Sequence, residues 1–160
     1  MAHSLVVDQS LVTPVAVTDA FHRTLPIPLP TLFARWYGPF PPIREVREQT
    51  GAWDAVGQTR VVHLVGGATM REELTSVDPP HSFGYRLREF TGPMALLIDH
   101  VIGEWTFAPA GSGTDITWRW DIYPRSALTA WALPLLGRAW KGYARRALRD
   151  LSAELTGSGR

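Results

Sequence analysis

The sequence predicts an α+β fold in which a curved antiparallel sheet of about six to seven strands wraps around a long C-terminal α-helix. Two patterns predict it: a series of β-type runs separated by hairpin turns, and one long amphipathic helical stripe at the C-terminus. The chain has 160 residues, which suits one domain. We expect residues 1–14 to be an N-terminal extension and residues 15–157 to form the single domain.

The first part of the domain reads as a strand followed by short helices. Phe21–Ile27 has the composition of a strand, and the alternating prolines that follow would end it. Pro30–Tyr37 reads as a short helix that closes at Gly38. The next three prolines leave room for at most one more helical turn.

The middle of the chain is a succession of β-type runs. They span residues 43–49, 58–65, 68–77, 82–90, 96–107 and 114–123. Turn-forming residues separate them, including Gly66-Gly67 and the segment 78–81. Because short turns join antiparallel neighbours, these runs predict a meander.

The last element is an amphipathic helix that begins near Ser126 and ends before Gly157. Its apolar stripe contains Leu133, Leu136, Trp140, Tyr143, Ala144, Ala147, Leu151 and Leu155. The opposite stripe contains Arg138, Lys141, Arg145, Arg149 and Ser152. We interpret this second stripe as a solvated face, with contact to phosphates or a membrane surface as the alternative.

Two hairpins suggest which side chains face inward. A two-residue turn at Gly66-Gly67 would place Val61 opposite Glu72 and His63 opposite Met70. A four-residue loop at 78–81 would place Leu74 opposite Tyr85, Glu72 opposite Leu87 and Ser76 opposite Phe83. Both turns predict an inner face that carries Glu72, His63 and Tyr85.

The last two strands differ in how clearly they are patterned. Residues 114–123 alternate cleanly and place Trp118 and Trp120 inside. For residues 96–107 two registers remain open, and a bulge at Gly103 is a third solution. One register turns inward Val101, Trp105 and Phe107 together with Asp99, and the other turns inward Ile98, His100 and Ile102 together with Glu104. We favour the register with Trp105 and Phe107 inside.

Composition excludes several classes of function. The chain has no cysteine, so disulfides and thiolate chemistry are absent, and we expect a cytoplasmic protein. A net charge of +1 gives no general attraction to nucleic acid. The N-terminus lacks a signal-peptide pattern, and no apolar run is long enough for stable membrane insertion. The histidines show no metal-ligand spacing, and no cofactor motif is present, so we expect neither metal nor cofactor.

Four segments resemble one superfamily. They are Phe21–Pro28 followed by Leu32-Phe33, Gly57–Arg60, Met70–Pro80 with Tyr85, and Gly103–Pro109 followed by Gly113-Thr114. Together with the element order, they resemble the SRPBCC superfamily of START-like and birch-pollen-allergen-like proteins, and within it the polyketide cyclase/dehydrase-like branch. The resemblance implies a helix-grip fold with an apolar ligand cavity between sheet and C-terminal helix.

The inner faces predict the residues that would meet a ligand. They are Val61, His63, Met70, Glu72, Leu74, Phe83, Tyr85, Asp99, Val101, Trp105, Trp118, Trp120, Leu136, Trp140 and Tyr143. Such a wall favours a hydrophobic small molecule as the partner. The resemblance implies that this molecule is a lipid, a polyketide or a similar compound.

Three functional hypotheses follow. The first is a binding protein for a hydrophobic small molecule. The second is a polyketide cyclase, aromatase or dehydratase with Glu72, His63 and Tyr85 as acid–base groups. The third is a packed domain that works through partners, with its own tryptophans filling the space between sheet and helix. The sequence leaves a homodimer open.

Overall fold

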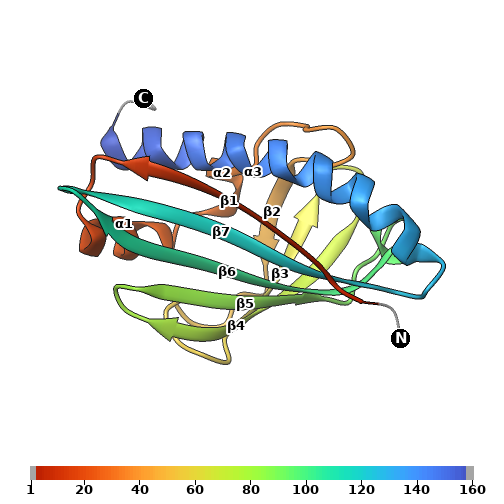
Figure 1. The fold of residues 1–160 in the computed structure, drawn as a ribbon. Coiled ribbons are helices and arrows are strands. Elements are labelled where there is room, and N and C mark those ends of the chain that lie inside the picture. The colour runs from red at the N-terminus through yellow and green to blue at the C-terminus, as the bar shows by residue number, and fades with distance from the viewer. Residues whose placement is uncertain (1–2, 158–160) are drawn as a thin grey trace.

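The computed structural model describes residues 3–157. Its elements, in chain order, are β1 (Leu5–Thr13), α1 (Val17–Thr24), α2 (Leu29–Leu32), β2 (Ile43–Arg47), β3 (Thr59–Leu64), β4 (Thr69–Asp78), β5 (Ser82–Arg88), η1 (Pro93–Leu96), β6 (Ile98–Ala110), β7 (Gly113–Pro124), η2 (Thr129–Ala132) and α3 (Leu133–Thr156). The strands form one antiparallel sheet in the order β1-β7-β6-β5-β4-β3-β2. Figure 1 shows this curved sheet with α3 lying along it. The predicted α+β helix-grip fold is therefore confirmed.

The N-terminal predictions were wrong. Leu5–Thr13 is an edge strand rather than part of an extension, because it pairs with β7 along its whole length and buries Val7 against the core. Phe21–Ile27 is not a strand, since its first residues belong to α1, which buries Ala20, Phe21 and Thr24 on one face. The partner of β1 lies more than 100 residues away, so no nearby turn announces the pairing.

The short helix predicted at Pro30–Tyr37 is shorter than expected. Only Leu29–Leu32 is helical, with a proline in its first turn. Tyr37 instead forms an isolated bridge with Phe40. The chain then reaches β2, whose first residue, Ile43, donates its N–H to the carbonyl of Phe33.

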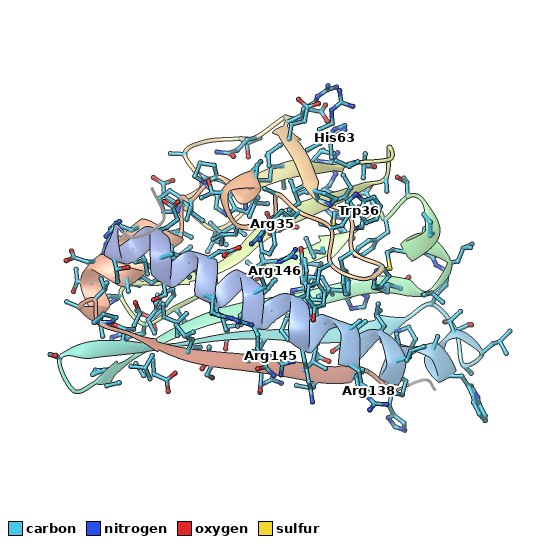
Figure 2. All side chains as sticks on the ribbon, turned by 90° about the horizontal axis from the view of Figure 1, so that it is seen from above. Arg35, Trp36, His63, Arg138, Arg145 and Arg146 are labelled. Atoms are coloured by element: carbon cyan, nitrogen blue, oxygen red, sulfur yellow. The ribbon has the colours of Figure 1, made fainter. Side chains whose placement is uncertain are left out.

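The first hairpin differs from the prediction by one residue. Three loop residues, 65–67, separate the last hydrogen-bonded pair, Leu64 and Ala68, because the N–H of Leu64 donates to the carbonyl of Ala68. Glu72 therefore lies opposite Arg60 rather than Val61. Because side chains alternate along a strand, this shift turns Val61 and His63 to the outer face. Figure 2 shows His63 at the margin of the molecule, away from α3.

The second hairpin follows the prediction on one side of a β-bulge. Leu74 lies opposite Tyr85, and Glu72 lies opposite Leu87, as expected. The register shifts between Leu74 and Ser76, so Val77, not Ser76, lies opposite Phe83. Tyr85 and Glu72 therefore keep their predicted inward positions.

The structure determines which side chains of the last two strands face inward, including those of residues 96–107, for which two registers were open. Trp118 and Trp120 on β7 are buried, as predicted. On β6 a bulge lies between Ile98 and His100, not at Gly103. It turns both Ile98 and Val101 inward and leaves Asp99 on the outer face, so the expectation that Asp99 accompanies Val101 was wrong.

The C-terminal helix keeps its predicted apolar stripe but begins later. Ser126 does not cap α3; it exchanges hydrogen bonds with Thr129 in the turn before η2. Pro134 lies in the first turn of α3, where its missing N–H costs nothing. Gly157 ends the helix with φ +75°, as the glycine predicted. Every residue of the predicted stripe is buried.

Candidate functional site: an apolar cavity between sheet and helix

A cavity of about 640 Å³ lies between the inner face of the sheet, the α2–β2 segment and α3. Its lining is predominantly apolar. The exposed lining residues belong to three segments, at Trp36 and Pro39, at 65–67 and at 91–93, and these mark where the cavity opens. The hypothesis of a domain filled by its own tryptophans predicted no void here, so this hypothesis was wrong.

The structure divides the predicted ligand-contacting residues into three groups. The residues on the cavity wall are Met70, Glu72, Phe83, Tyr85, Trp105, Trp118, Trp120, Leu136 and Tyr143. The residues in the packed core behind the wall are Leu74, Val101 and Trp140. The residues on the outer face are Val61, His63 and Asp99.

The third group does not belong to the cavity. Val61 and His63 point outward because the first hairpin has a three-residue loop. The carboxylate of Asp99 is exposed and lies 2.7 Å from Nδ1 of His100. The expected acid–base group His63 is thus on the opposite face of the sheet from Glu72 and Tyr85.

Sequence reasoning missed two important wall residues, Arg60 and Trp53. Arg60 occupies the inward position that the shifted register takes from Val61. Trp53 comes from the loop between β2 and β3, where its backbone has φ +59°, a conformation that no sequence pattern announced. The charge of Arg60 did not indicate a wall position either, because a charged residue in a strand is expected to face solvent.

Arg60 and Glu72 form a buried ion pair in the wall. Nε of Arg60 lies 2.5 Å from Oε1 of Glu72, and each residue is only 5% exposed. The indole of Trp53 covers the guanidinium, with its ring centroid 3.8 Å from Cζ. Burial raises the pKa of Glu72, although the positive charge and hydrogen bond of Arg60 act in the opposite direction. The pair places two complementary charges in an apolar wall.

Tyr85 is held by two tryptophans. Its hydroxyl oxygen accepts hydrogen bonds from Nε1 of Trp118, at 2.7 Å, and from Nε1 of Trp120, at 2.8 Å. Its ring lies against Gly103, where a Cβ would come within 2.1 Å of the tyrosine Cζ. Burial, together with the nearby charge of Glu72, raises the pKa of Tyr85, so the phenol stays protonated.

The phenol proton of Tyr85 is available to a ligand. Both indole groups are donors only, so neither accepts that proton. Within residues 3–157 no protein acceptor for it was found. A bound molecule with a carbonyl or hydroxyl oxygen would supply one.

Stacked aromatic rings make the remaining wall stiff. Trp105 and Trp118 stack with centroids 4.9 Å apart, and Phe40 stacks on Tyr143 at 4.7 Å. Phe33 also stacks on Tyr143, at 5.3 Å. Interlocked rings of this kind preserve the shape of a cavity without a ligand.

The described part of the chain has neither a metal site nor a membrane span. Within residues 3–157 no group of three or more His, Asp or Glu side chains is arranged to hold a metal ion. In the same range no helix has the length and apolarity needed to cross a bilayer.

The fold and cavity define the class. A seven-stranded antiparallel sheet around a long C-terminal helix, with an apolar cavity between them, is the architecture of the SRPBCC superfamily. Residues 5–156 match the family described as polyketide cyclase/dehydrase and lipid transport, and the chain belongs to this family. The match begins at the first residue of β1, which agrees with the place of that strand in the sheet.

Solved structures share the fold at low sequence identity. Major latex-like protein 151 from Panax ginseng has a TM-score of 0.69 and 13% identity, with 95% of this chain and 97% of that chain covered. Norcoclaurine synthase from Thalictrum flavum has a TM-score of 0.68 and 15% identity, with 97% and 96% covered. A protein from Nitrosospira multiformis has a TM-score of 0.65 and 19% identity, with 98% and 100% covered. No curated protein sequence matched this chain.

Proposed function

We propose that this protein binds one elongated hydrophobic small molecule in the cavity between sheet and α3. The observation that carries the proposal is the cavity itself, about 640 Å³ in volume and lined mostly by apolar side chains. This volume lies within the range of small-molecule sites. The family description, which includes lipid transport, supports the same class of ligand.

The distribution of polar groups favours a ligand with one polar end. Arg60 and Leu64 both face inward on β3, four residues apart, which corresponds to about 13 Å along an extended strand. Leu64 adjoins the opening, whereas Arg60, Glu72 and Tyr85 lie farther in. A molecule with a carbonyl or hydroxyl group at its inner end would satisfy the free proton of Tyr85, while its apolar remainder extends toward the opening.

The polar groups support binding better than catalysis. The enzyme hypothesis required His63 as the proton carrier beside Glu72, and His63 lies on the outer face. Glu72 is engaged by Arg60, and Tyr85 is held as a neutral phenol. Groups of this kind orient a ligand, whereas general acid–base catalysis needs groups that exchange protons near neutral pH.

Titration with an uncharged naphthylamine fluorophore tests the proposal. We expect saturable binding of one fluorophore per chain, with energy transfer from the tryptophans of the wall. A lipid extract from the source cells should displace the fluorophore. A folded sample that shows no saturable uptake of fluorophore would contradict the proposal.

Cytoplasmic location and dimer formation stay predictions. The absence of cysteine is consistent with a reducing compartment. Size-exclusion chromatography with light scattering would measure the mass of the particle in solution and so test the dimer.

A further inference from the structure

Three large apolar side chains protrude into solvent where β7 leads into α3. Leu128 is 82% exposed, Trp131 is 87% exposed and Leu135 is 73% exposed. They are spaced by three and four residues, so they lie on one side of the helical segment formed by η2 and the start of α3. A tryptophan this exposed leaves a large apolar surface in water.

The same side of α3 continues as a basic stripe. Arg138, Arg145 and Arg149 follow Leu135 at spacings that keep them on the outward face, and Lys141 lies beside them. Figure 2 shows Arg138 and Arg145 along one margin of α3, whereas Arg146 lies on the other margin beside Arg35. Within residues 3–157 no acidic side chain forms an ion pair with any of these four outward cations.

Acidic residues are missing from this part of the sequence. Between Asp121 and Asp150 the chain contains no aspartate or glutamate. The basic residues in that interval are Arg125, Arg138, Lys141, Arg145, Arg146 and Arg149. A nearly neutral protein therefore concentrates positive charge on one helix and the turn before it, which gives this face a local potential that the net charge conceals.

A fourth exposed apolar side chain, Leu96, lies at the cavity rim. Leu96 on η1 is 72% exposed, while its neighbours Met94 and Leu97 line the cavity. The backbone N–H of Arg125 donates to the carbonyl of Leu97, so η1 is joined to the segment that leads into η2. The η1 side of the opening is therefore joined to the segment that carries the protruding apolar residues and leads into the basic stripe.

We propose that this end of the molecule docks on an anionic lipid bilayer. Leu96, Leu128, Trp131 and Leu135 enter the headgroup region, and Arg138, Lys141 and Arg145 contact lipid phosphates. An apolar cluster with a tryptophan and a flanking basic stripe is the combination that binds such interfaces, since burial of apolar area and attraction to anionic lipids add together. Docking in this orientation brings the cavity opening to the membrane surface.

Vesicle flotation tests the proposal. We expect the protein to float with vesicles of three parts phosphatidylcholine and one part phosphatidylglycerol, and to remain behind with phosphatidylcholine alone. Neutralising Arg138 and Lys141 together, as Arg138→Gln and Lys141→Gln, should weaken binding roughly fivefold for each charge removed. Trp131→Ala should weaken it at least as much as one charge does, because the indole supplies the largest apolar surface of the cluster.

Matched variants distinguish vesicle binding by this end of the molecule from non-specific binding by other exposed residues. Val12→Ala alters a residue on β1 that is 61% exposed, and Arg119→Gln removes a cation from the outer face of β7; both should bind vesicles like the wild type. The altered side chains are all exposed, so circular dichroism should report an intact fold. Equal binding by Trp131→Ala and wild type, equal binding to both kinds of vesicle, or binding to duplex DNA in place of vesicles would each overturn the proposal.

Discussion

At the scale of single residues, the buried ion pair between Arg60 and Glu72 predicts that removal of one charge destabilises the fold. Glu72→Gln leaves a buried guanidinium without its counter-charge, so we expect a loss of about 3–5 kcal/mol in the free energy of unfolding. The double variant Arg60→Met, Glu72→Leu removes both charges and should lose much less. Urea denaturation measures all of these values.

The matched control for this prediction is Glu73→Gln. Glu73 is the next residue on β4 and reaches Arg88 at 3.6 Å in a solvated pair on the outer face. Glu73→Gln should lower the free energy of unfolding by less than about 1 kcal/mol. If both variants lost the same free energy of unfolding, the result would contradict a stabilising role for the buried pair of Arg60 and Glu72.

The buried phenols predict instability in alkali. The pKa values of Tyr85 and Tyr143 are raised in the folded chain, mainly by burial, above the value of about 10 that they have when unfolded. Their stabilising contribution is therefore complete below about pH 10 and is lost as pH rises further, with a slope of about 1.4 kcal/mol per pH unit for each phenol.

Urea denaturation at a series of alkaline pH values checks this prediction. Tyr85→Phe should remove about half of the loss of stability above pH 10. Tyr123→Phe, which removes a hydroxyl from a half-buried residue outside the cavity wall, should leave the loss unchanged. A Tyr85→Phe variant with the full pH dependence of the wild type would contradict the assigned burial of the phenol.

The residues of the cavity wall could be predicted from the sequence only where the register of the strand pairing was predicted correctly. Glu72 and Tyr85 were found from the sequence because a chain of alternating residues connects them through the second hairpin. Arg60 was missed and His63 wrongly included because the first loop has three residues instead of two, and a shift of one residue reverses every side chain of β3. A glycine pair is compatible with both loop lengths, so the sequence alone does not choose between them.

At the scale of elements, β1 is the strand whose importance the sequence concealed. It covers the edge of β7, and Leu5 and Val7 contact α3 at Gly137, where a Cβ would come within 2.8 Å of the Leu5 side chain. We expect deletion of residues 1–13 to abolish cooperative unfolding, because it exposes both the edge of β7 and the underside of α3.

Deletion of residues 1–4 is the matched control, since it leaves β1 intact. This shorter variant should keep the thermal transition of the full chain, measured by circular dichroism. A stable protein without residues 1–13 would restore the view that these residues are an extension.

The other elements were predictable to different degrees. The six later strands were placed within a few residues because short turns connect most of them, and α3 was recognised because its apolar stripe has a strict helical spacing. Phe21 was assigned to a strand because prolines downstream end strands and helices alike. Local patterns thus succeeded where the contacts are local in sequence.

At the scale of the whole molecule, the sheet and α3 enclose more space than their side chains fill. The stacked rings of Trp105 and Trp118 and the rings around Tyr143 hold the walls apart. Since voids of this size forfeit packing energy, their retention is best explained by a molecule that fills the space.

Two adjacent residues of β3 provide the most direct test of this account. Leu64 faces the cavity and His63 faces outward, so Leu64→Trp adds bulk to the ligand space and His63→Trp adds the same bulk outside it. The measurement is the affinity for the naphthylamine fluorophore, determined by fluorescence titration and checked by displacement with lipid. The account predicts that Leu64→Trp lowers the affinity at least tenfold while His63→Trp keeps that of the wild type. Equal affinities in two folded variants would contradict a ligand site inside the cavity.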